Sequence, residues 1–166
     1  ADLTADRTAL ADTLRQLPRP EGGFTGVLAL PPTPAADTAD DDPAGTAALA
    51  PTAAALTALD DAGISAPLWL LTRQAVSTGR ADRLAHPGQA ALWGLGRVAA
   101  LERPERRLTL VDLPEQLDER AVRRLAHLLA APVGEQRAAG TESASPGTEN
   151  QLAVRASATY ARRLAH

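Results

Sequence analysis

The sequence of 166 residues contains no cysteine, no lysine and no methionine. The absence of cysteine excludes disulfides, thiol nucleophiles and cysteine-based metal sites, and it fits a reducing, cytoplasmic compartment. The absence of lysine excludes a Schiff-base lysine, a P-loop lysine and any Tyr-x-x-x-Lys pair, because all 17 basic residues are arginine. Without a methionine the sequence does not begin at a natural start codon, and we expect it to be a segment of a longer protein.

Long apolar runs and an excess of positive charge are also absent. No stretch approaches the roughly 18 apolar residues of a membrane span. The first residues do not form a signal peptide, because charged residues between Asp2 and Asp12 interrupt the apolar run that it requires. The net charge of -3 gives no support to nucleic-acid or acidic-membrane partners. Length alone predicts one domain over 1–166 with a sizeable core.

Apolar periodicity divides the first half of the chain into alternating helices and strands. A helix carries Leu3, Leu10, Leu14 and Leu17 on one face, with Thr4 as its N-cap. The apolar run 24–30 is typical of a buried parallel strand. A second helix starts near Pro51, buries Leu56, Leu59 and Ala62, and ends at Gly63. A second buried strand covers 67–72.

The second half continues this alternation. We expect a helix over 89–103, which Pro104 ends, and a strand over 108–113. Asp118 caps a helix whose inner face is Val122, Leu125, Ala126 and Leu129. Strands 152–155 and 159–164 form a hairpin. The order predicts an α/β fold with right-handed crossovers and a mostly parallel sheet, which helices cover on both faces.

Two segments lack periodicity, and we expect both to be mobile loops. Residues 31–46 are rich in Pro, Ala, Asp and Thr, and residues 132–150 in Gly, Ser and Ala. The acidic run 40–42 lacks the glycine turn and distal Glu of a calcium loop, which favours a solvated loop over a metal site.

The segment 94–99 matches the form G-x-G-x-x-A of a dinucleotide-binding turn. Such a turn needs a strand directly before the glycines, whereas residues 89–93 are typical of a helix. We therefore expect Gly94 and Gly96 to lie inside a helix, where close packing on the sheet offsets their cost of about 1 kcal/mol each. Trp93 is then expected to be a core or subdomain-contact residue.

Four segments in order resemble a known family: 60–73 (DDAGISAPLWLLTR), 86–102 (HPGQAALWGLGRVAALE), 110–114 (LVDLP) and 155–164 (RASATYARRL). Together they resemble the ketoreductase region of modular type I polyketide synthases and span most of 24–166. The resemblance implies a truncated Rossmann-like fold, similar to short-chain dehydrogenases. It corresponds to the N-terminal structural subdomain alone.

In that family the C-terminal half binds NADPH and carries the catalytic Ser, Tyr, Lys and Asn. The sole tyrosine here is Tyr160, and the residue four positions later is Leu164. A catalytic Tyr-x-x-x-Lys pair requires lysine at that position. The resemblance therefore assigns this chain no catalytic, cofactor-binding or metal residue. It implies as partners the catalytic subdomain, with its NADPH, and other synthase domains including the acyl carrier protein.

The chain departs from the family pattern in four places. Arg107-Leu108-Thr109 replace Trp-Gly-Gly, and Ala158 replaces a glycine, which strains the hairpin if that turn needs a positive φ. The loop 132–150 is longer. A strand and helix that the family has before residue 1 are absent, so we expect an edge of the sheet to be incomplete or supplied by another segment.

The remaining polar residues give only weak signals. The three histidines, His86, His127 and His166, have no metal-ligand spacing, and no serine lies in a nucleophile elbow. We expect the arginine pairs 106/107, 123/124 and 162/163 to be solvated or to contact other domains. Three hypotheses remain open: a structural ketoreductase subdomain, a self-contained NADPH-dependent reductase, and a docking module that uses the acidic loop 35–42.

Overall fold

A computed structural model describes residues 6–31, 47–130 and 149–163. The expected loops 31–46 and 132–150 lie almost entirely outside these residues, as do Leu3, Thr4 and the acidic segment 35–42. The order of elements in the described part is the one predicted from sequence, helix and strand alternating up to a final pair of strands.

The helices are α1 (Arg7–Arg15), α2 (Leu49–Asp61), α3 (Ala90–Glu102) and α4 (Glu119–Ala130). The strands are β1 (Val27–Ala29), β2 (Leu68–Arg73), β3 (Leu108–Leu113), β4 (Gln151–Val154) and β5 (Thr159–Ala161). They form one sheet in the order β1-β2-β3-β4-β5. The first four strands are parallel, and β5 returns antiparallel to β4. The mostly parallel sheet and its final hairpin are therefore confirmed.

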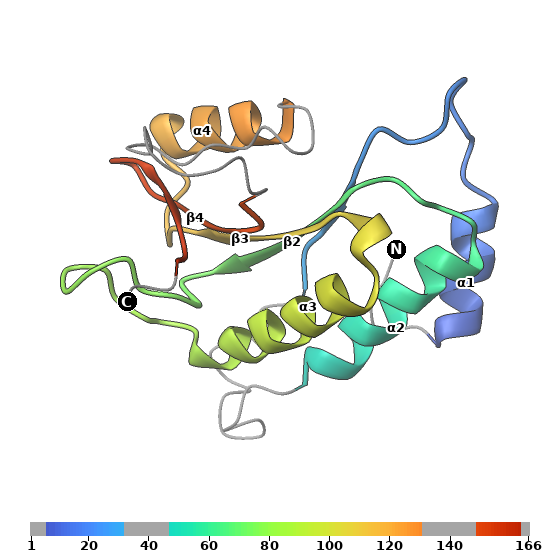
Figure 1. Cartoon of the computed structure of the whole chain (residues 1–166), viewed down its shortest axis with the longest axis horizontal. Helices are drawn as coiled ribbons and strands as arrows, with labels where there is room; N and C mark the ends of the chain where they lie inside the picture. Colours follow the sequence, from blue (N-terminus) through green and yellow to red (C-terminus); the bar gives the residue numbers. More distant parts are fainter. Residues whose placement is uncertain (1–5, 32–46, 131–148, 164–166) are drawn as a thin grey trace.

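The central strands are buried on both sides, as continuous apolar sequences require. Alternate side chains of β2 and β3, such as Leu68, Leu70 and Leu110, pack against α2 and α3 on one face. The intervening ones, such as Leu71 and Val111, pack against α4 on the other (Figure 1). Helix α1 packs on α2, with Leu10 buried at that contact.

The expectation that all crossovers are right-handed is wrong for at least one of them. The chain steps in one direction from β1 to β4, so crossovers of one hand would place α2, α3 and α4 on the same face. Helix α4 lies opposite α2 and α3. Leu71 and Val111 make the second face of the sheet apolar as well, and α4 covers that face with Ala121 and Leu128.

Two details of packing differ from the sequence prediction. Strand β1 is shorter than 24–30 and lies at the edge of the sheet, so Leu28 and Leu30 are exposed. Helix α4 buries Ala121 and Leu128, whereas Val122 is 49% exposed and Ala126 is also exposed. The contact with the sheet selects the small Ala121 over the larger Val122.

The predicted helix ends are better preserved. Gly63 follows α2 with a φ of 67°, the left-handed conformation expected of a C′ glycine. The carboxylate of Asp118 accepts a hydrogen bond from the Ala121 N–H at 2.7 Å, which confirms it as the cap of α4.

Candidate functional site

The carboxyl ends of the parallel strands are where open α/β sheets normally bind ligands. In this chain that position holds Asp112 near the end of β3, Thr72 near the end of β2, and Arg155 directly after β4. All three side chains are buried, Asp112 completely. The question for function is whether this arrangement leaves room for a ligand.

Asp112 is held by donors from both neighbouring strands, from β2 with the residues just after it and from the end of β4. One oxygen, Oδ1, accepts from the Thr72 hydroxyl at 2.7 Å and from the Ala75 backbone N–H at 2.8 Å. The other, Oδ2, accepts from Arg155 Nη2 at 2.8 Å. A buried carboxylate is tolerated when it is paired and hydrogen-bonded in this way.

Arg155 uses its whole guanidinium within the chain. Its Nε donates to Asp82 Oδ2 at 2.8 Å, and its Nη atoms also donate to the carbonyls of Asp112, Val154 and Val76. Burial alone would raise the pKa of Asp82. The hydrogen bonds from Thr78, together with Arg155, outweigh that effect and hold the pKa of Asp82 below its ordinary value. Arg155 therefore ties the strand ends together and spans the position of the usual ligand crevice.

Trp93 of α3 completes this cluster. Its indole Nε1 donates to the Thr72 hydroxyl at 2.9 Å, so the chain of hydrogen bonds runs from Trp93 through Thr72 to Asp112. Trp93 and Arg97 have the i,i+4 spacing of a Tyr-x-x-x-Lys pair on a helix. An indole only donates hydrogen bonds, and a guanidinium does not deprotonate in proteins, so this pair offers no acid of the phenol type. Trp93 lies in the core, which is the first of the two roles expected for it.

The glycine run lies in the middle of α3, as predicted. Its backbone N–H groups belong to the helix and are not arranged to hold a phosphate. A Cβ on Gly96 would lie 2.5 Å from Leu110 Cδ2, which confirms the close packing expected there. The same expectation is wrong for Gly94, where a Cβ would meet nothing within 4 Å because this residue faces away from the sheet.

The features that usually hold a dinucleotide are arranged differently in the described residues. The strand ends carry a saturated arginine–carboxylate cluster, and the glycines lie inside a helix. Tyr160 lies on β5, partly exposed, and its hydroxyl is 3.1 Å from Ser157 Oγ. Leu164 and His166 are outside the described residues. Among the residues that are described, no three His, Asp or Glu side chains are grouped as metal ligands.

The hairpin turn at Ala158 differs from the strained one considered from sequence. Among the described non-glycine residues, positive φ values occur only at Gln74 and Arg107. The Ala158 carbonyl accepts from the Arg155 N–H at 2.9 Å, which closes the turn without that strain.

Four of the six paired arginines are exposed, as expected for solvated side chains, whereas Arg106 and Arg124 are more buried. Arg106 is buried, pairs with Asp60 and donates to the Ile64 carbonyl. Arg124 donates to the carbonyls of Ala156 and Ser157, and so joins α4 to the hairpin. Arg123 forms an ion pair with Glu119, and Arg163 forms one with Glu149. Arg162 donates a hydrogen bond to the side chain of Gln151. The sequence could not show the partners of Arg106 and Arg124, because these partners come from distant segments.

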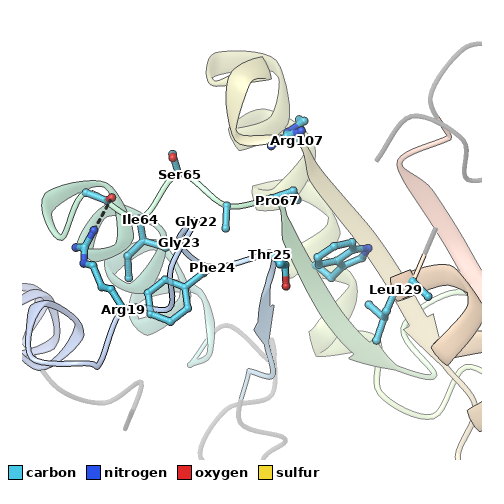
Figure 2. A pocket seen from close by; sticks show the side chains of 14 residues that line it. Arg19, Gly22, Gly23, Phe24, Thr25, Ile64, Ser65, Pro67, Arg107 and Leu129 are labelled. Atoms are coloured by element: carbon cyan, nitrogen blue, oxygen red, sulfur yellow. Dashed lines mark hydrogen bonds between the residues drawn. The ribbon is translucent and has the colours of Figure 1, made fainter. Parts of the chain in front are cut away.

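A hollow of about 600 Å³ lies at the opposite, amino ends of β1 and β2 (Figure 2). Arg19 lies at one side and donates to the Ala62 carbonyl at 2.5 Å, while Leu129 of α4 lies at the other. The indole Nε1 of Trp69 in its wall is buried without a partner. Among the described residues that line this hollow there is no carboxylate and no histidine.

A second hollow, of about 530 Å³, lies between α3 and the β4–β5 hairpin. Trp93, Arg97 and Tyr160 line it, with Arg162 and Arg163 at the hairpin. The described part of its wall contains no Asp, Glu, His or Lys. In the described residues, no helix is long and apolar enough to cross a membrane.

Comparison with known proteins agrees with this architecture. Residues 1–164 match the family model described as "Polyketide synthase extender module SpnB, Rossmann fold domain". The chain is 47% identical over 163 residues to polyketide synthase GfsA of Streptomyces halstedii, and 48% identical over 160 residues to the pikromycin synthase component PikAIII of Streptomyces venezuelae. It spans only 2% and 8% of these two proteins.

Two solved structures have the same fold. An A-type ketoreductase from a modular polyketide synthase superposes with a TM-score of 0.74 at 44% identity, and a C2-type ketoreductase with a TM-score of 0.72 at 37% identity. They cover 97% and 98% of this chain, and the chain covers 31% and 33% of them. The chain belongs to the Rossmann fold domain family of polyketide synthase extender modules and is related to their ketoreductases.

Proposed function

We propose that this chain is the non-catalytic structural subdomain of a polyketide synthase ketoreductase. In this proposal it packs on a catalytic subdomain and stabilises it, and that partner reduces the β-ketoacyl group on an acyl carrier protein with NADPH. The chain's own residues bind no cofactor and transfer no proton. Its contribution is a rigid surface against which the catalytic subdomain folds.

One observation carries the proposal: the strand ends are closed by side chains that satisfy one another. Asp112 and Arg155 are both buried, and neither has a free group directed at a substrate. The sequence has no lysine to lower the pKa of a catalytic tyrosine. The relationship to ketoreductases about three times as long supports the idea that the chemistry belongs to a second part.

Association with a catalytic subdomain tests this function. The chain is co-expressed with the catalytic half of a related ketoreductase, and the mixture is separated by size-exclusion chromatography. We expect a one-to-one complex with a higher melting temperature than the catalytic half alone. Two separate species, with the catalytic half no more stable than before, would contradict the proposal.

A further inference from the structure

The hollow between α3 and the β4–β5 hairpin has arginine side chains on both sides, and we call it the α3–hairpin hollow. Arg97 comes from α3, and Arg162 and Arg163 directly follow β5. Glu149 pairs with Arg163, whereas the described part of the wall contains no acidic residue. Within the described residues, no carboxylate therefore neutralises the charges of Arg97 and Arg162.

Arg97 makes no hydrogen bond or ion pair with the described residues, unlike Arg155, whose whole guanidinium is used. It lies one helical turn after Trp93, whose indole is 4% exposed and donates to Thr72. The helix therefore fixes the backbone of Arg97 beside the hollow. Its guanidinium is free to bind a partner from outside the described chain.

The hairpin places Arg162 on the other side of the hollow. The Arg162 backbone N–H donates to the Gln151 carbonyl at 2.9 Å, and its Nη1 donates to the Gln151 side-chain oxygen at 3.3 Å. Because an amide is neutral, this bond orients the guanidinium without cancelling its charge. Tyr160 lies two residues earlier and pairs with Ala153, so it shares this face of the hairpin.

The wall of the hollow also contains apolar side chains beside these charges. Val76, Ala90, Trp93 and Ala153 contribute to it, and Ala153 is 4% exposed. The volume of about 530 Å³ lies within the range of small-molecule sites. The hollow can therefore accept a ligand with a charged group and a short carbon chain.

The loop after β2, which forms the rim, is fixed by its own hydrogen bonds. Thr78 donates to the Asp82 carboxylate from its backbone N–H at 2.9 Å and from its hydroxyl at 2.8 Å. Ser77 donates to the Asp82 carbonyl at 3.0 Å, and Arg155 holds the same carboxylate from β4. A ligand would therefore meet a rim that is already ordered, which lowers the entropic cost of binding.

A phosphate group matches the charged part of the hollow, because a guanidinium donates paired hydrogen bonds to phosphate oxygens. The position also suits a ligand: Val76 and Thr78 follow the carboxyl end of β2, the edge at which open α/β sheets bind small molecules. We propose that the α3–hairpin hollow binds a small organic phosphate ester. Arg97 and Arg162 hold the phosphate, and the carbon chain lies against the apolar wall. This site goes beyond the proposed packing on a catalytic subdomain and does not depend on it.

Calorimetric titration of the full chain with butyl phosphate at 0.15 M sodium chloride tests the site. We expect one molecule to bind per chain, and we expect Arg97→Gln and Arg162→Gln each to weaken binding by about tenfold or more. Arg120→Gln is the matched control, because it removes the same charge from an exposed position on α4. All three side chains are exposed, so the melting temperatures of the variants should match that of the unsubstituted chain. An equal loss of affinity in all three variants would show attraction by net charge alone and overturn the site.

Three further probes separate the two parts of the ligand. Inorganic phosphate lacks the carbon chain and should bind about tenfold more weakly than butyl phosphate, whereas butanol lacks the charge and should not bind. Pentanoate presents a carboxylate on a similar chain and should bind more weakly than butyl phosphate. Butanol or pentanoate binding as tightly as butyl phosphate would overturn the choice of a phosphate ester, and so would inorganic phosphate binding equally well.

Nuclear magnetic resonance of the amide groups locates the bound ligand without any substitution. On addition of butyl phosphate we expect chemical-shift changes at 76–78, 90–97 and 159–163, and none in α4. Changes near Arg19 and Arg107 instead would assign the ligand to the hollow at the amino ends of the strands and overturn the proposal. Either result leaves the association with a catalytic subdomain to its own test.

Discussion

Two glycines on one helix should respond in opposite directions to the same substitution. Gly94 and Gly96 both lie inside α3, so alanine gains about 1 kcal/mol of helix propensity at either position. At Gly94 a Cβ meets nothing within 4 Å, and the gain is retained in full. Gly94→Ala should therefore raise the free energy of unfolding by about 1 kcal/mol.

At Gly96 the new methyl group would lie 2.5 Å from Leu110 Cδ2 and 3.2 Å from its Cγ. Leu110 is 1% exposed on the central strand β3, so its side chain has little room to move. Overpacking of this kind costs about 1–3 kcal/mol, which exceeds the gain in propensity. Gly96→Ala should therefore lower the free energy of unfolding by about 1 kcal/mol.

The assay is chemical denaturation of the isolated chain, followed by circular dichroism, with thermal melting as a second readout. For a domain of this size, 1 kcal/mol shifts the melting temperature by about 2–4 °C, upward for Gly94→Ala and downward for Gly96→Ala. Equal stabilisation by both substitutions would refute the packing of Gly96 on β3. Destabilisation by Gly94→Ala would refute the open space around Gly94.

Three further predictions concern the cluster at the strand ends. Arg155→Ala leaves the buried Asp112 unpaired and should cost about 3–5 kcal/mol in a urea unfolding curve, and a loss below about 1 kcal/mol would show that the cluster is not structural. Asp82→Asn removes a carboxylate whose folded-state pKa is lowered, so its stabilisation is present above about pH 4 and is lost as pH falls through the folded-state pKa. The difference in unfolding free energy between this variant and the unsubstituted chain should shrink toward acid pH, and a pH-independent difference would refute the ion pair. Trp93→Phe removes the indole donor to Thr72 and should cost about 1–2 kcal/mol, measured by the same unfolding curve, whereas an unchanged stability would contradict that bond.

The regular elements could be predicted because their local sequences carry the necessary information. The apolar run 108–113, ended by Pro114, corresponds residue for residue to β3. Gly63 and Asp118 determine the end of α2 and the start of α4 by local backbone and capping chemistry. The order of elements follows from these segments and is confirmed.

The buried charges could not be predicted because their partners are distant in sequence. Arg155 and Asp82 are 73 residues apart and meet only when β4 joins the sheet. Arg106 belongs to a double arginine that is typical of an exposed face, yet the ion pair with Asp60 holds it in the interior. The side of the sheet taken by α4 also depends on tertiary packing, and the crossover rule does not determine it.

The most direct test of the account is a comparison of NADPH consumption by three samples with a β-ketoacyl substrate: this chain alone, a catalytic half alone, and the two together. The account predicts no consumption by the chain, and faster and longer-lasting consumption by the pair than by the catalytic half. Consumption by the chain alone, or a pair no better than the catalytic half, would contradict it.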